Sequence, residues 1–253
     1  MAVSANPIHQ FEIQEYFPVI KIAGHQIAFT SSALFMLIAV ALTVALMLGA
    51  TAGRRLVPNR MQSLAEVFYE FVADMIRSNA GEEGLKFFPL VFSIFMFVLF
   101  ANLVGLIPLT FSVTSQVIIT ASLALLVFFT VIIHGFWKHG LHFLKLFAPS
   151  GVPILILPMI VMIEILSFFA RPISHSLRLF ANILAGHITL YLVGSFSAMM
   201  IAALGVLGWF AAALPLALTV TLYALELLVA LLQAYVFAIL TCIYLNDSLH
   251  PGH

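Results

Sequence analysis

Residues 215–246 read PLALTVTLYALELLVALLQAYVFAILTCIYLN, and Glu226 is the one charged residue in this stretch. An α-helix rises 1.5 Å per residue, so about 20 apolar residues cross the ~30 Å hydrocarbon core of a membrane. The stretch is longer than a perpendicular crossing requires. It therefore predicts a tilted or kinked membrane helix, and the rest of the chain agrees with that environment.

The composition excludes a soluble globular protein. Of the 253 residues, 63% are hydrophobic and 8% are charged, and the mean hydropathy is +1.17. A soluble domain is roughly half apolar and about a quarter charged, so these few charges could not cover its surface. We predict an all-α integral membrane protein, with residues 1–253 forming a single membrane domain.

Five hydrophobic runs make up this predicted domain. The last two come from a tract, residues 152–245, that is too long for one helix, and we divide it between residues 194 and 215, where glycines and a proline occur. Each of these two helices would be ~45–60 Å long, so strong tilt or proline kinks are expected. The predicted membrane helices span residues 27–50, 87–109, 117–137, 153–193 and 215–246.

Residues 61–78 show a different pattern. Apolar side chains recur at helical spacing, while Glu66, Glu70 and Asp74 lie on other faces. This pattern is typical of an amphipathic helix at the membrane surface or against a partner, and its charges argue against a membrane crossing.

Basic residues between the hydrophobic runs predict the orientation of the chain. They form two groups, Arg54, Arg55, Arg60, Arg77 and Lys86 in one loop and Lys138 and Lys145 in another. The two loops share a side if the second and third membrane helices form a hairpin. Because positive charge marks the cytoplasmic side, we expect the N-terminus outside and the C-terminus inside.

Polar side chains within the last two hydrophobic runs are the candidates for function. An ionisable group inside a membrane costs at least ~2.5 kcal/mol on insertion scales, so each is a functional hypothesis by default. Spacings of 4, 3 and 4 residues place four of them on one stripe of a helix. These candidates are Glu164, Arg171, His175, Arg178, Asn182, His187, Glu226 and Gln233.

The expected hairpin of the last two helices predicts which of these side chains share a depth. In an antiparallel pair, residues at one level have a constant sum of residue numbers. His187 with Glu226 and Arg178 with Gln233 give nearly equal sums, which centre the turn near residue 206. We therefore predict a His–Glu couple at one level and an Arg–Gln couple about two turns away.

The chemistry of these groups suits proton transfer. Imidazole titrates near neutrality and can exchange a proton with a carboxylate over one hydrogen bond or one water molecule. The guanidinium of Arg178 cannot deprotonate, so it can block protons but cannot relay them. Titratable groups on either side of a permanent cation predict two proton paths separated by an electrostatic barrier.

Structural explanations stay open for several of these residues. Arg171 could extend to lipid headgroups, His175 could be a packing residue, and Glu164 could be solvated at the membrane surface. Arg178 could form a buried salt bridge with Glu226 or Glu164, although an apolar pair would be less costly. Amides commonly join membrane helices, an explanation that applies to Asn102, Asn182 and Gln233.

Other classes of site are not indicated. The sequence has no glycine-rich phosphate loop and no nucleophile elbow. The single cysteine, Cys242, cannot form an intramolecular disulfide, and the histidines near residues 134–142 lack the cysteine or carboxylate cluster of a metal site. Ten basic and ten acidic residues balance, so no nucleic-acid partner is indicated. We expect no cofactor and no metal.

The segment ARPISHSLRLFANILAGH, residues 170–187, resembles the characteristic segment of the a subunit of rotary (F-type) ATP synthases. FANLVGLIP, residues 100–108, and LQAYVFAILT, residues 232–241, follow the order of the same family. The His187 and Glu226 pair resembles the alphaproteobacterial and mitochondrial branch, since some other bacterial members carry the pair exchanged. Gly105 stands where some relatives have an acidic residue.

The resemblance implies a role for each candidate. Arg178 matches the arginine that faces the ring carboxylate and prevents a proton short circuit, and Asn182 and Gln233 match polar residues around it. His187 and Glu226 match the outer half-channel. On the cytoplasmic side, Glu164 matches the acidic position of the second half-channel, and Asp247 contributes near the end of the last helix.

The same resemblance implies partners and a location. The chain would be a non-catalytic, proton-translocating stator, in contact with a ring of c subunits, b-type peripheral stalk subunits, the remaining ATP synthase subunits and membrane lipid. The expected location is the bacterial inner membrane rather than the mitochondrial one. Two alternatives stay open, namely a proton-coupled secondary transporter, which predicts an internal repeat that we do not find, and a structural anchor of a respiratory complex.

Overall fold

The computed structural model describes residues 14–22, 25–52, 58–107, 110–147, 153 and 155–250. In these ranges the regular secondary structure is helical apart from one β-hairpin, which confirms the all-α class. Five helices are long and apolar enough to cross a membrane. The helices are α1 (Ser31–Thr51), α2 (Arg60–Ala80), α3 (Phe88–Gly105), α4 (Val117–His139), α5 (Leu157–Leu204) and α6 (Val206–Leu249). Shorter elements are β1 (Glu15–Ile22), β2 (His25–Thr30) and the 3-10 helices η2 (Glu82–Phe87), η3 (Val113–Ser115) and η4 (Gly140–Phe147).

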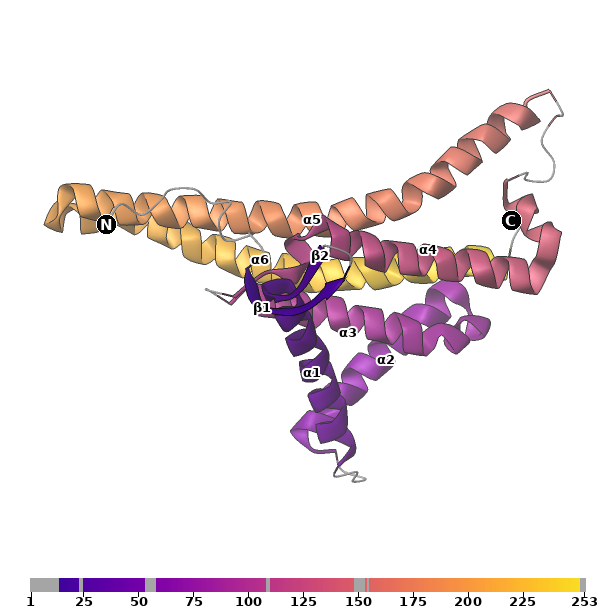
Figure 1. Cartoon of the computed structure of the whole chain (residues 1–253), viewed down its shortest axis with the longest axis horizontal. Coiled ribbons are helices and arrows are strands. Elements are labelled where there is room, and N and C mark those ends of the chain that lie inside the picture. The colour runs from indigo at the N-terminus through magenta and orange to yellow at the C-terminus, as the bar shows by residue number, and fades with distance from the viewer. Residues whose placement is uncertain are drawn as a thin grey trace.

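The long helices α5 and α6 form the axis of the molecule. They run side by side, while α3 and α4 pack against them and α1 and α2 project to one side (Figure 1). The N-terminal part of α5 diverges from the bundle, away from α4 and α6 (Figure 1). Pro172 lies inside α5, near this divergence, and proline weakens a helix because it removes one backbone hydrogen bond.

The hairpin of β1 and β2 corrects the predicted start of the first membrane helix. The helix was expected from residue 27, but Ile27 lies in β2 and α1 begins at Ser31. The Oγ1 atom of Thr30 accepts a hydrogen bond from the Ala33 N–H at 3.4 Å, which caps the helix at this point. Hydropathy alone does not separate an apolar strand from the helix that follows it.

The turn between α5 and α6 corrects a second boundary. Helices were expected over 153–193 and 215–246 with a long connection, but α5 continues to Leu204 and α6 begins at Val206. Gly205 alone makes the turn, with φ of 55°, a conformation that favours glycine because it has no Cβ. The turn centre near residue 206, deduced from residue sums, is therefore within one residue of the observed turn.

The predicted surface helix, residues 61–78, lies within α2. The Oδ1 atom of Asn59 accepts from the Arg60 N–H at 2.7 Å at its start, and Gly81, with φ of 68°, ends it. One face is buried against α3 and α6, whereas Glu66, Glu70 and Asp74 are exposed.

Two features of the sequence lie outside the described residues. They are Arg54 and Arg55, used to predict the orientation, and the Pro149–Gly151 turn.

Asn102 joins three elements inside the bundle. Its side chain is 1% exposed; its Nδ2 donates to the Ala230 carbonyl of α6 at 3.2 Å, and its Oδ1 accepts from the Thr114 hydroxyl of η3 at 2.8 Å. Asn102 therefore joins helices, which is the structural explanation that the sequence had left open.

We expect Asn102→Leu to destabilise the protein, because it removes the partner of the buried Thr114 hydroxyl and the side-chain bond between α3 and the Ala230 carbonyl of α6. The cost should be about 1–3 kcal/mol. The midpoint of thermal unfolding in detergent measures it. Ser122→Ala is the control, since the exposed Ser122 hydroxyl bonds only within α4, to the Ile118 carbonyl. Equal midpoints for the two variants would contradict the role of Asn102.

Candidate functional site

The His–Glu couple is present between α5 and α6. The Nε2 atom of His187 lies 3.7 Å from the Oε1 atom of Glu226, and the two side chains are 15% and 5% exposed. The prediction that these two residues share a depth is confirmed. Neither oxygen of Glu226 has a hydrogen-bond partner among the described residues. A carboxyl group this buried is costly without a partner, so the arrangement is suited to proton exchange with the imidazole or with water.

Gly186 makes room for the Glu226 side chain. A Cβ atom at Gly186 would lie 2.7 Å from Oε1 of Glu226 and 3.0 Å from its Cδ. The absence of a side chain therefore lets the carboxyl group lie against the backbone of α5. The sequence interpretation missed this residue, because a glycine inside a helix gives no sign of a contact until the facing helix is placed.

A cavity adjoins the couple on the α5 and α6 surface. It has a volume of about 220 Å³ and is lined by Asn182, Gly186, Thr189, Glu226 and neighbouring apolar side chains. This volume is large enough for several water molecules. The Glu226 carboxyl group is therefore buried in the protein and still borders a space that water can fill.

Gln233 pairs with Asn182 instead of Arg178. The Nδ2 atom of Asn182 donates to the Oε1 atom of Gln233 at 2.9 Å. The predicted Arg–Gln couple is therefore wrong. Gln233 is 4% exposed and faces the interior, whereas Arg178 lies on the exposed face of α5. Residue sums predict the depth of a side chain but not the direction in which it points.

Arg178 makes no hydrogen bond or ion pair with any residue in the described part of the chain. The salt bridge to Glu226 or Glu164, considered above as an alternative, is not among the ion pairs of these residues. Four small exposed residues, Ser174, Ala181, Ala185 and Thr189, lie on the same side of α5 as Arg178, together with the exposed Asn182.

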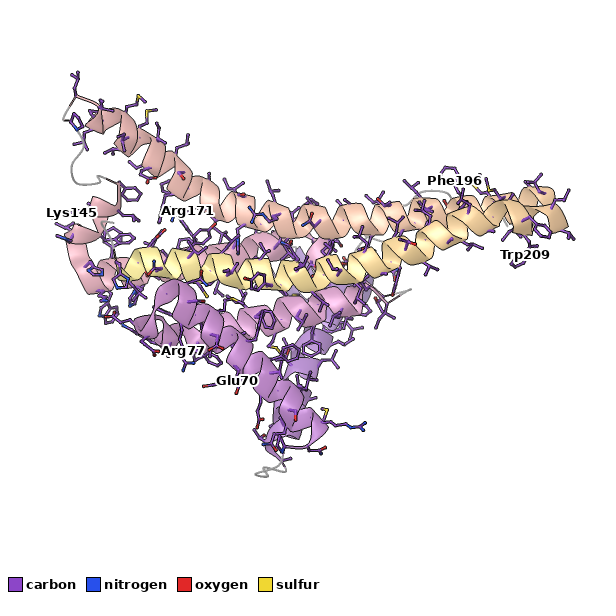
Figure 2. The ribbon with its side chains drawn as sticks, turned by 180° about the vertical axis from the view of Figure 1, so that it is seen from behind. Glu70, Arg77, Lys145, Arg171, Phe196 and Trp209 are labelled. Carbon is purple, nitrogen blue, oxygen red and sulfur yellow. The ribbon has the colours of Figure 1, made fainter. Side chains whose placement is uncertain are left out.

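Arg171 is held inside the molecule and does not extend into the lipid. Its Nη1 atom pairs with Oδ2 of Asp247, each side chain being 26% exposed, and so connects α5 to α6. The rings of Phe168 and Tyr244 lie 5.6 and 5.4 Å from the guanidinium carbon. Figure 2 shows Arg171 between the two helices. Asp247, predicted as a contributor to proton transfer, is thus placed as the partner of a cation.

Glu164 and His175 lie on the same helix in different surroundings. Glu164 is half-buried on the part of α5 that leaves the bundle, about 21 Å along the helix from Arg178. His175 is 3% exposed, and the centre of its ring lies 3.7 Å from that of Phe237. This contact agrees with the packing role considered for His175.

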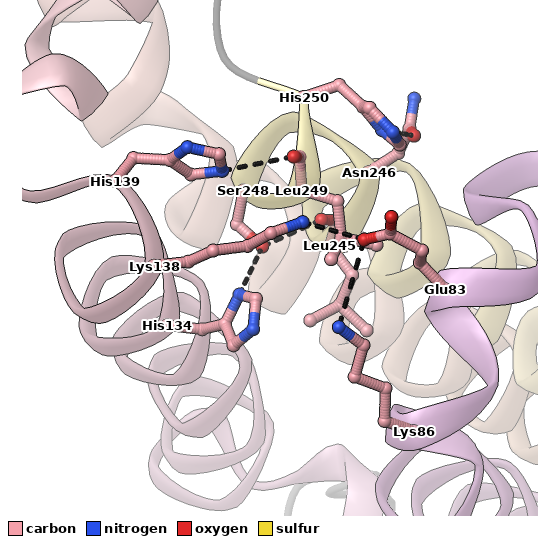
Figure 3. A network of polar contacts seen from close by, with 10 residues as sticks. All are labelled: Glu83, Lys86, His134, Lys138, His139, Leu245, Asn246, Ser248, Leu249 and His250. Carbon is pink, nitrogen blue, oxygen red and sulfur yellow. Dashed lines mark hydrogen bonds and ion pairs between the residues drawn. The ribbon is translucent and has the colours of Figure 1, made fainter.

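A second polar cluster anchors the end of α6 (Figure 3). The Lys138 Nζ atom of α4 donates to Oε2 of Glu83 at 2.6 Å, and the His139 ring bonds the Leu249 carbonyl at 3.1 Å. The Ser248 hydroxyl lies 3.4 Å from Nδ1 of His134. The two histidine contacts fix α6 against α4, and the Lys138 bond fixes α4 against η2. No group of three metal-ligating side chains occurs within the described ranges.

Comparisons with known proteins agree on one family. The model of the family described as ATP synthase A chain matches residues 33–246. A protein of Rhodopseudomonas palustris strain TIE-1, named ATP synthase subunit a, is 64% identical over 251 residues, which cover 99% of this chain and all of that protein. Proteins of the same name from Nitrobacter winogradskyi and Afipia carboxidovorans are each 64% identical, over 98% of this chain and 99% and 100% of their own lengths.

We expect Gly186→Ala to slow ATP-driven proton transport at least tenfold, because the new methyl group would displace the Glu226 carboxyl. Membrane vesicles that contain the assembled complex provide the measurement. Gly194→Ala, in the same helix, is the matched control, since its Cβ would meet no atom within 4 Å. Transport at the control rate in Gly186→Ala would show that the position of this carboxyl is unimportant.

Proposed function

This chain belongs to the ATP synthase A chain family, and we propose that its Arg178 separates two proton paths and faces a carboxylate that a moving partner carries past it. The chain is the proton-translocating subunit of the membrane sector of an ATP synthase and is not catalytic by itself. It is a protein of the bacterial inner membrane and assembles with other ATP synthase subunits.

The observation that carries the proposal is the unpaired cation. Arg178 lies in a helix that is apolar enough to cross a membrane, it is exposed, and it has no partner among the described residues. A guanidinium that faces hydrocarbon is costly. A carboxylate on another subunit would remove this cost, because guanidinium and carboxylate form strong, charge-assisted hydrogen bonds.

The face around Arg178 supports a closely packed helical partner. Four small residues, Ser174, Ala181, Ala185 and Thr189, follow this side of α5 on either side of Arg178. Small residues let the backbones of membrane helices approach closely. We assign this face to the ring of c subunits, each of which would bring one carboxylate to Arg178.

The first proton path would use the couple of His187 and Glu226. A proton from the outside would reach the cavity beside Glu226 and pass by water or imidazole to a ring carboxylate. The hydrogen bond between Asn182 and Gln233 fixes the wall of this cavity. Because the guanidinium favours the ionised carboxylate, a ring site that reaches Arg178 would release its proton.

The second path would lead along the diverging part of α5. Glu164 lies there, on the same side as Arg178, and has no partner within the described ranges. The released proton would move past Glu164 toward the cytoplasm. Asp247 would act indirectly, because its carboxylate holds Arg171 and thus the spacing of α5 and α6 at this end.

Other faces are free for the remaining proposed partners. The exposed side of α2 carries apolar residues such as Val67, Tyr69 and Phe71 beside its acidic ones, a mixture that suits a b-type stalk subunit near the membrane surface. Exposed apolar side chains on α1 would contact lipid. The nucleotide chemistry would take place on other subunits. The alternative of a proton-coupled secondary transporter is not favoured by the family.

We expect Arg178→Ala to abolish ATP-driven proton pumping and to raise the passive proton leak of the assembled complex, since the barrier between the paths would be gone. Quenching of a pH-sensitive dye in inverted membrane vesicles measures both. Lys145→Ala removes an exposed cation of η4 and should leave both unchanged. Normal coupled pumping in Arg178→Ala would refute the proposed role.

We also expect the His187 and Glu226 positions to act as a couple. Glu226→Gln and His187→Gln should each slow pumping by roughly 10²–10⁴-fold, the usual contribution of a positioned acid or base. The double exchange, His187→Glu with Glu226→His, should recover part of the rate because it restores an imidazole next to a carboxyl group. A double variant no faster than either single variant would show that the two residues act independently.

A further inference from the structure

Arg178 can obstruct protons on one side of α5 only. It lies on the exposed face, while the opposite face of the same helix packs against α6 and α4. A proton that followed the buried interface of α5 and α6 would pass behind the cation. Along that interface, polar side chains occur at depths on the cytoplasmic side of Arg178 and on its outer side. Whether protons can pass behind Arg178 depends on the side chains that lie between these two polar regions.

On the cytoplasmic side, the polar region ends at His175. Its side chain is 97% buried, and its Nε2 atom has no hydrogen-bond partner among the described residues. His175 lines a small cavity of about 10 Å³ together with Arg171 and Tyr244. This is roughly the volume that one water molecule needs, and a water there would satisfy Nε2 in either tautomer. With that water in place, polar groups would extend from Asp247 through Arg171 to His175.

On the outer side, the polar region ends at Asn182 and Gln233. Asn182, which donates to Gln233, lines the 220 Å³ cavity that Glu226 also lines. The distance along α5 from Asn182 to His175 is seven residues, or about 10 Å. Gln233 lies closer to His175, because it is one helical turn from Phe237, whose ring contacts the His175 ring. A proton could cross only if water or polar groups interrupted the apolar side chains that separate these two residues.

An apolar layer fills this interval. Phe237 and Leu179, 1% and 0% exposed, lie within it, and Ile183, 2% exposed, continues the layer directly after Asn182; all three belong to one buried cluster. Phe237 lies one turn from Gln233 along α6, and its ring contacts that of His175 at 3.7 Å. Phe237 therefore lies between the two polar regions, with Gln233 on one side and His175 on the other. Two buried hydroxyls lie nearby on the α4 side of α5. They belong to Ser176 and Thr120 and bond to each other at 3.1 Å, so they are not part of the layer that faces α6.

We propose that Phe237, Leu179 and Ile183 form an internal proton seal, a second barrier behind the cation. The inference rests on the two proton paths proposed above. Proton transfer needs a continuous chain of hydrogen-bonding groups or waters, and a dry, close-packed apolar layer provides none. The guanidinium would exclude protons from the face toward the ring, and the seal would exclude them from the interior of the subunit.

Phe237→Ser tests the seal, because it opens space and adds a hydroxyl in the middle of the layer. Phe237→Leu is the matched control, since it keeps the layer apolar. In vesicles with the complete complex, Arg178 intact and no nucleotide present, we expect Phe237→Ser to raise the passive proton leak roughly tenfold, equivalent to about 1.4 kcal/mol of barrier. The Phe237→Leu complex should leak no more than the unaltered complex.

Leu179→Ser provides the same test at a smaller side chain if Phe237→Ser does not assemble. A leak at the level of the unaltered complex in an assembled serine variant would overturn the seal. This failure is distinct from failure of the proposed function, which would appear as normal pumping in Arg178→Ala. A leak in Phe237→Leu equal to that in Phe237→Ser would also overturn the proposal, because altered packing would then be the cause.

Discussion

A polar group inside a membrane must find a partner within the protein or on another subunit, because lipid offers none. The described bundle meets this requirement at most of its buried positions. Asn102 bonds across α3, η3 and α6, and Arg171 is paired across α5 and α6. These bonds hold the helices in register. Against this background the few groups without such a partner, Arg178 above all, are the places where we propose that the protein acts on another subunit.

The fold class and the depth of the site in the membrane could be predicted from the sequence. The directions in which the side chains of the site point could not. Hydropathy is a property of composition, so the membrane helices follow from it. Residue sums depend only on the helical rise and the turn, and they placed His187 beside Glu226 correctly. They failed for Arg178 and Gln233, because the side on which each residue lies depends on how the two helices are rotated. The β-hairpin was missed because an apolar strand resembles the start of an apolar helix.

The residues that sequence interpretation missed share a physical cause. Gly186 and Phe237 are apolar, and nothing in a hydrophobic tract distinguishes them from neighbours that only fill space. Their importance comes from the facing helix, which brings a carboxyl group onto one and a buried imidazole onto the other. Such contacts join residues 40 or more positions apart in the chain. Only the placement of α5 against α6 reveals them.

In the proposed mechanism, the two faces of α5 prevent a proton leak by different physical effects. Toward the partner, the barrier must be electrostatic, because a carboxylate has to pass through it and any apolar plug would stop that movement. Toward α6 nothing needs to move, so a dry layer suffices, and it avoids the cost of a second buried charge. Under this arrangement a proton can cross the membrane only on the moving carboxylate. The coupling of proton flow to rotation then depends as much on the close packing around Phe237 as on the charge of Arg178.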